Sequence, residues 1–204
     1  MKQIKSQKIQ TMALFAILAA IVVVMSITPL GYLKIGLLEI SFLTIPVTIG
    51  AVLLGPASGA ALGFVFGITS FIQCFGMSAF GATLLGINPF YTFILCIVPR
   101  VLMGLLTGLI FKWIAKVDKT KIVSYAVASM SGAILNTVLF MSLFVLCFYN
   151  TEFVQGTVTA LGTTNVFAFA AAFVGSNAFF EAIVAFLVSF PVTKAVARYS
   201  KRFS

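Results

Sequence analysis

The sequence contains no histidine and only four acidic residues. Histidine is the commonest general base and metal ligand in proteins, so its absence argues against an enzyme and against a metal or other cofactor site. Charged residues of both signs make up 8% of the chain, whereas soluble domains carry about a quarter. This shortage excludes an ordinary soluble fold.

Cysteine is also scarce, with three residues in the chain. Cys74, Cys96 and Cys147 lie within or beside apolar runs and lack the paired spacing of a metal site. We interpret them as small hydrophobic residues. The sequence also lacks a nucleophile–base motif, a phosphate loop and a nucleotide site. These absences favour a protein that captures a ligand without transforming it.

Long apolar runs dominate what remains, because 61% of the residues are hydrophobic. An apolar stretch of about 20 residues can span a bilayer as a helix. We therefore predict a single all-α domain over residues 1–204, a polytopic membrane protein with six transmembrane helices in one bundle. The helices are expected at about residues 11–27, 40–54, 57–75, 88–112, 122–148 and 166–192. The connecting segments 29–40, 76–87 and 149–165 are predicted as loops, the second as a loop or a re-entrant segment.

The basic residues cluster at the ends of the predicted helices and set the orientation. Of the 13 lysines and arginines, three lie in the first ten residues, four at 112–121 and four after residue 193. Six spans put these eleven on the side of both termini, and the opposite side holds only Lys34. Basic loops remain in the cytoplasm. Both termini are therefore predicted to be cytoplasmic, and the net charge of +9 reflects orientation rather than nucleic-acid binding.

One ionisable residue, Arg100, lies in the middle of a predicted span. It follows Pro89 by 11 residues and precedes Lys112 by 12. At 1.5 Å per residue it lies roughly 16–18 Å from each end, near the centre of the hydrocarbon layer. An arginine cannot be deprotonated there, which suggests a function and a partner. The alternative is a structural role, in which Arg100 pairs with a carboxylate and locks two helices together.

Four polar side chains on three predicted helices converge on one depth. Counted from the basic residues at the cytoplasmic ends, they lie roughly 18–25 Å into the membrane. They are Arg100, Glu181, Asn136 and Asn177. Random substitutions would scatter over the depth, so we predict a small-ligand site between bundle helices that opens toward the outside. The residues expected at its mouth are Asn88, Tyr91 and Gln73.

Other interpretations of these residues stay open. The polar groups can instead form a buried network that only packs helices, and Tyr91 and Gln73 can be interfacial anchors. The chain can also be an ion or proton path, or a scaffold subunit. A proton relay needs several carboxylates in series, and only Glu181 lies deep in the membrane.

Small residues recur at four-residue spacing on three predicted helices. Such spacing produces a smooth face that lets another helix approach closely. The sets are Ala16 and Ala20, then Gly59, Gly63 and Gly67, and finally Gly104 and Gly108.

Three segments carry a resemblance that covers nearly the whole length. They are IPVTIGAVLLGPASGAALGFVFGITSF at 45–71, FILCIVPRVLMG at 93–104 and NAFFEAIVAF at 177–186. Together with the first helix, they resemble the substrate-binding S component of energy-coupling factor (ECF) vitamin transporters. The resemblance implies a prokaryotic plasma-membrane protein that works with a transmembrane coupling subunit and two cytoplasmic ATPases. It also implies that the face with Ala16 and Ala20 docks on the coupling subunit, while the outer loops close over the vitamin.

Within that family, the LLGP turn, the VPR of the fourth helix and the NxxxE of the sixth look most like pantothenate-type members. Pantothenate offers a carboxylate for Arg100, and hydroxyl and amide groups for Asn136 and Asn177. Glu181 would then orient Arg100 or accept a ligand hydroxyl. Riboflavin is the alternative substrate, although the polar depth lacks an obvious aromatic stacking pair. Pyridoxine-like molecules and vitamin precursors also remain open.

Overall fold

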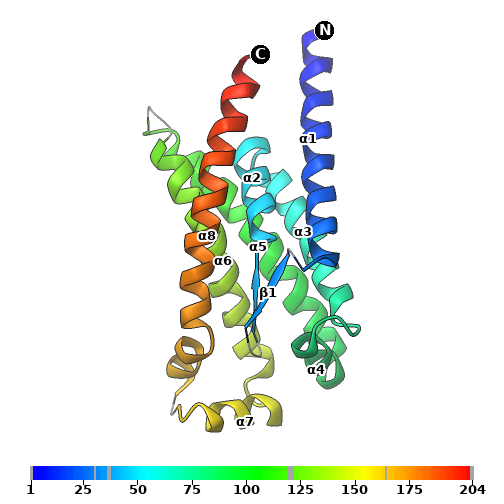
Figure 1. Cartoon of the computed structure of the whole chain (residues 1–204), viewed down its shortest axis with the longest axis vertical. Coiled ribbons are helices and arrows are strands. Elements are labelled where there is room, and N and C mark those ends of the chain that lie inside the picture. Colours follow the sequence, from blue (N-terminus) through cyan, green and yellow to red (C-terminus); the bar gives the residue numbers. More distant parts are fainter. Residues whose placement is uncertain (1, 30, 36–37, 119–121, 164, 203–204) are drawn as a thin grey trace.

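The computed structural model describes residues 2–29, 31–35, 38–118, 122–163 and 165–202. The chain forms a helical bundle with one short β-hairpin after the first helix (Figure 1). The elements are α1 (Lys2–Ile27), β1 (Tyr32–Ile35), β2 (Leu38–Ser41), α2 (Thr44–Leu54), α3 (Pro56–Gln73), α4 (Ala79–Ile87), α5 (Pro89–Ile114), α6 (Ile122–Phe148), α7 (Glu152–Ala160) and α8 (Val166–Arg202). The start of α1 and the end of α8 lie at one end of the bundle, and α4 and α7 lie at the other (Figure 1).

Within the described residues, five helices are long and apolar enough to cross a membrane, so the protein is a polytopic membrane protein. The apolar spans found in the described residues are Lys8–Ile27, Pro56–Gln73, Pro89–Ile114, Ile122–Phe148 and Phe179–Val196. The predicted second span corresponds to α2, which has 11 residues and is therefore only about 16 Å long. A hydrocarbon layer is about 30 Å thick. The six predicted spans thus correspond to five long helices and one short helix.

Prolines and caps determine where two of the long helices begin. Pro56 and Pro89 occupy the first turns of α3 and α5. The N–H groups of a first turn have no acceptor within the helix, so a proline there loses no hydrogen bond, and its fixed φ suits a helix. The Asn88 side chain accepts a hydrogen bond from the Tyr91 N–H at 3.1 Å and caps α5. Gly55 separates α2 from α3 with a φ of 97°, a conformation that favours glycine.

Three short elements occupy segments that were predicted as loops. The hairpin pairs Tyr32 with Ser41 in antiparallel register, and it is the exception to an all-α fold within the described residues. Helices α4 and α7 replace parts of the predicted loops 76–87 and 149–165. Helices of nine residues are marginal in isolation. They form here because Leu84 of α4 and Val154 of α7 are buried in one aromatic cluster with the longer helices.

Close packing of α3 on α5 confirms the predicted glycine faces. A Cβ atom on Gly63 would collide with the carbonyl oxygen of Arg100, and one on Gly104 would collide with the carbonyl oxygen of Gly59. Only a residue without a side chain allows backbones to approach this closely. The glycines of α3 therefore determine where the backbone of Arg100 lies.

Candidate ligand-binding site

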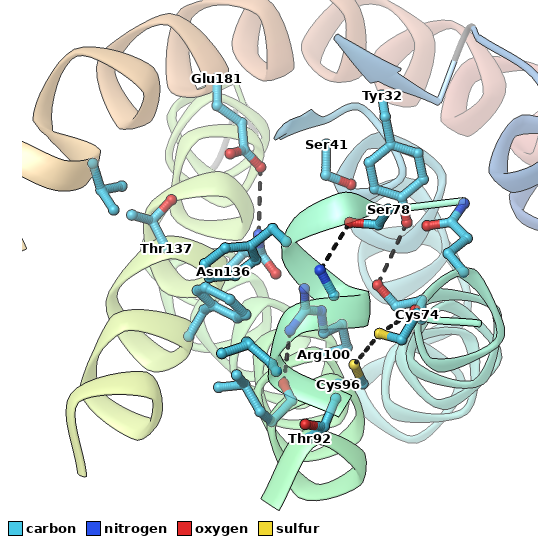
Figure 2. A pocket seen from close by; sticks show the side chains of 18 residues that line it. Tyr32, Ser41, Cys74, Ser78, Thr92, Cys96, Arg100, Asn136, Thr137 and Glu181 are labelled. Carbon is cyan, nitrogen blue, oxygen red and sulfur yellow. Dashed lines mark hydrogen bonds between the residues drawn. The ribbon is translucent and has the colours of Figure 1, made fainter. Parts of the chain in front are cut away.

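A cavity of about 120 Å³ lies inside the bundle, and its wall is built by both strands and by α3, α4, α5, α6 and α8 (Figure 2). One water molecule requires roughly 10–15 Å³ of such space, so the cavity accommodates more than isolated waters. Residues of α4 line it. The cavity therefore lies toward the end of the bundle that is opposite the two chain termini (Figure 1).

Arg100 is buried in the cavity wall, with 8% of its surface exposed. Its Nη1 donates a hydrogen bond of 2.8 Å to the carbonyl oxygen of Leu95. In a regular helix that carbonyl would accept from the N–H four residues later. Residue 99 is a proline inside α5 and has no N–H. The proline thus leaves an acceptor unused, and the guanidinium of the next residue takes it.

Two aromatic rings also contact the guanidinium. Its central carbon lies 4.8 Å from the ring centre of Phe140 and 5.4 Å from that of Phe66. Such cation–π contacts stabilise a desolvated cation by about 2 kcal/mol. The Nε atom of Arg100 is buried and has no hydrogen-bond partner within the described part of the chain. Arg100 is therefore held in position while one of its donors remains unused.

Glu181 and Asn136 form the second polar pair in the wall. Asn136 Nδ2 donates to Glu181 Oε1 over 3.5 Å (Figure 2), a long hydrogen bond. Both residues are buried, and Asn136 Oδ1 has no partner among the described residues. The same part of the chain contains no ion pair between Arg100 and Glu181 within 4.0 Å. The described geometry thus lacks the helix-locking pair that was the structural alternative for Arg100.

Two further contacts tie the hairpin and the end of α1 to the cavity wall. The hydroxyls of Tyr32 and Ser70 lie 3.5 Å apart, and all three of Tyr32, Ser70 and Gln73 line the cavity. Gln73 Nε2 donates to the carbonyl oxygen of Ser26 in the last turn of α1. The cavity wall is consequently continuous with the segment that connects α1 to α2.

The predicted site residues separate into two groups. Arg100, Asn136, Glu181 and Gln73 line the cavity together. Asn88 and Tyr91 do not: Asn88 caps α5, and Tyr91 is 42% exposed with its ring against Phe148. The side chain of Asn177 lies outside the described residues. Ala16 and Ala20, predicted to face the coupling subunit, are both exposed on α1.

Several residues that line the cavity were not predicted from the sequence as site residues. Thr92 and Cys96 precede Arg100 at intervals of four residues, and residues four apart share a helix face, so this spacing was a usable signal. Ser70 of α3 likewise precedes Cys74 by four residues, and Cys74 is the residue that follows α3. Tyr32 and Ser41 gave no signal, because they reach the cavity through a hairpin that was predicted as a loop.

An apolar helical bundle whose internal cavity is lined by a few buried polar side chains is typical of a membrane protein with a small-molecule site. Comparison with protein families identifies the kind of membrane protein. The model of the family described as ECF transporter, substrate-specific component, matches residues 10–193. The protein belongs to that family, as its resemblance predicted. It is a multi-pass membrane protein of a prokaryotic cell, and its family has a transport role rather than an enzymatic one.

A curated relative adds a narrower likeness. A stretch of 101 residues is 33% identical to the pantothenate transporter PanT of Leuconostoc mesenteroides subsp. mesenteroides. The aligned stretch covers 47% of this chain and 48% of that protein. The match thus spans about half the length of the relative.

Proposed function

We propose that the protein captures pantothenate at the outer face of the membrane, as the substrate-binding subunit of an ATP-driven ECF importer. The observation that carries the proposal is Arg100, a buried cation in the cavity wall that has an unused donor and lacks an ion pair among the described residues. An arginine fork matches a carboxylate in shape and charge. The similarity to a pantothenate transporter supports the same substrate.

The other polar groups complement the rest of such a ligand. Pantothenate carries an amide and two hydroxyl groups besides its carboxylate. Asn136 Oδ1 is buried without a partner in the described chain, so it can accept from an amide N–H or a hydroxyl. Glu181 Oε1 accepts a long hydrogen bond from Asn136, and a carboxylate has further lone pairs for a ligand hydroxyl. A bound ligand would therefore relieve polar groups that are costly when buried alone.

Alternative functions have weaker support. Glu181 is the one carboxylate on the cavity wall among the described residues, and a proton path needs several. For riboflavin, Phe80 and Phe140 do line the cavity. Phe140, however, already stacks on Phe144 and contacts Arg100. Its ring is therefore less available to stack on a flavin.

The proposed partners are a transmembrane coupling subunit and two cytoplasmic ATPases. The capturing subunit has no energy source of its own, so uptake requires work from such a module. The exposed small residues Ala16 and Ala20 offer a face on which another helix can pack closely. The family membership is the reason to expect this assembly.

Calorimetry on the detergent-solubilised protein tests the substrate. We expect tight binding of pantothenate, and affinity lower by at least about thirtyfold for the analogue whose carboxyl is an alcohol, because a charged contact contributes about 2 kcal/mol or more. Riboflavin serves as the second ligand. Equal affinity for the acid and the alcohol would show that Arg100 does not bind the ligand carboxylate. Tighter binding of riboflavin would show that riboflavin, and not pantothenate, is the substrate.

A further inference from the structure

Two cysteines from different helices meet in the cavity wall. The Sγ atoms of Cys74 and Cys96 lie 3.8 Å apart (Figure 2). Both side chains are buried and both line the cavity. From their position in apolar runs and their lack of paired metal spacing we interpreted them as small hydrophobic residues. They are 22 positions apart, and their contact depends on how α3 packs on α5, which the sequence does not give.

The local structure holds the two thiols face to face. Cys74 follows the last residue of α3, and its Sγ donates to the carbonyl oxygen of Ser70 at 3.4 Å. Cys96 lies within α5, one turn before Arg100. The helices touch here at Gly67, where a Cβ atom would lie 2.9 Å from the carbonyl oxygen of Cys96. The glycine face of α3 therefore positions Arg100 through Gly63 and the thiol pair through Gly67.

Helix α4 closes the other side of the pair. A Cβ atom on Gly81 would lie 2.7 Å from Cys74 Sγ, so a side chain at position 81 would press on the thiol where it now lies. Cys147, in contrast, is half-buried and lies outside the cavity lining. A small reagent that enters the cavity can thus reach Cys74 and Cys96 together, whereas Cys147 has a separate environment.

We propose that Cys74 and Cys96 form a reversible disulfide in the cavity wall by exchange with a small-molecule disulfide, and that this bond weakens ligand binding. The part that concerns binding rests on the proposed function, whereas bond formation does not. One cysteine thiolate attacks the small disulfide, forming a mixed disulfide and releasing one thiol. The second cysteine then attacks the mixed disulfide and releases the second thiol. The two cysteine protons end on the two released thiols, so the cysteines are oxidised and the reagent is reduced.

The bond must alter the wall beside Arg100. A disulfide holds its sulfur atoms about 2.0 Å apart, whereas the two Sγ atoms are now 3.8 Å apart. The sulfurs therefore have to approach by about 1.8 Å. Binding residues must keep their productive geometry within about 0.5 Å, and Cys96 precedes Arg100 by a single helical turn. We expect the oxidised protein to bind its ligand about tenfold more weakly or worse.

Intact mass and calorimetry on the solubilised full chain test the proposal. The probe is 2,2′-dithiodipyridine, followed by removal of excess reagent. With Cys147→Ala protein, we expect a product that retains no pyridylthiol and is lighter than the starting protein by about 2 Da, because a disulfide forms with the loss of two hydrogen atoms. Its affinity for pantothenate should fall about tenfold and return after dithiothreitol. The variant Cys74→Ala with Cys96→Ala should show no mass loss, and the reagent should leave its affinity unchanged.

Three outcomes would overturn the proposal. Retention of one pyridylthiol on each cysteine would show that the two thiols do not reach each other. Absence of any reaction would show that a small disulfide does not reach them. A disulfide that leaves pantothenate affinity unaltered would remove the effect on binding. Reduced protein that binds no pantothenate counts against the proposed function, and the mass measurement still decides whether the bond forms.

Discussion

At the scale of the residue, Arg100 is a buried cation whose direct contacts are neutral, with the carboxylate of Glu181 on the same cavity wall. Its contacts are the Leu95 carbonyl and the rings of Phe66 and Phe140. Removing a charge from water costs several kcal/mol unless a counter-charge compensates. Neutral dipoles and rings offset part of that cost and leave the charge available. This arrangement suits a site that receives an anion.

The substitution Arg100→Lys should weaken pantothenate binding by roughly thirty- to several-thousand-fold, because a lysine keeps the charge but loses the bidentate fork. Calorimetry measures this. The matched control is Lys116→Gln, which removes an exposed cation outside the cavity and should leave affinity unchanged. We further expect the double variant Arg100→Met with Glu181→Leu to fold and not to bind. Wild-type affinity in that double variant would assign Arg100 a purely structural role.

At the scale of the element, the contact between α3 and α5 positions the site. The backbone of α3 at Gly63 lies against the carbonyl oxygen of Arg100. Protein interiors are close-packed and transmit such displacements. A side chain at this position must therefore separate the two helices and move the guanidinium.

The substitution Gly63→Ala should destabilise the protein by about 1–3 kcal/mol, the usual cost of overpacking, and should also weaken pantothenate binding. Thermal unfolding in detergent and calorimetry report the two effects. The control is Gly86→Ala on α4, where an added Cβ meets nothing within 4 Å and stability should be unchanged or higher. Equal melting temperatures for Gly63→Ala and the wild type would show that α3 and α5 do not pack as described.

At the scale of the whole molecule, the proposed ligand site and the proposed docking face lie on different parts of the bundle. The cavity lies toward the end with α4 and α7 (Figure 1). Ala16 and Ala20 lie on the outside of α1, away from the cavity lining. A substitution on this face can therefore separate uptake from binding.

Ala16→Leu should abolish pantothenate uptake in cells while the purified variant still binds pantothenate normally, because added bulk prevents close helix approach. Ala172→Leu on α8, another exposed alanine, is the control and should transport normally. Radiolabelled uptake and calorimetry supply the two readouts. Undiminished uptake by Ala16→Leu would show that this face is not the docking surface.

The proposed orientation can be tested on the same scale. In a cysteine-free background (Cys74→Ala, Cys96→Ala and Cys147→Ala), a membrane-impermeant thiol reagent added to intact cells should label Glu152→Cys and should not label Lys116→Cys. The reason is the concentration of basic residues at 112–121 and at both chain ends, which remain in the cytoplasm. External labelling at position 116 would reverse the orientation and the assignment of the cavity to the outer side.

The sequence by itself determined the long helices and predicted that the polar groups lie at one level along them. Apolar length predicts a span, and α6 has the predicted bounds Ile122–Phe148. The height of a residue follows from counting residues at a constant rise along its helix. The sequence alone therefore predicts that Arg100, Asn136 and Glu181 lie at similar heights.

The tertiary structure alone decided which side chains meet at that level. Counting along a helix does not give its rotation relative to its neighbours, so the Cys74–Cys96 pair and the lack of an ion pair between Arg100 and Glu181 in the described chain were not predictable. The same holds for the hairpin, α4 and α7, since elements this short are stable only when packed against the bundle. Depth is a property of one helix, whereas contact is a property of two.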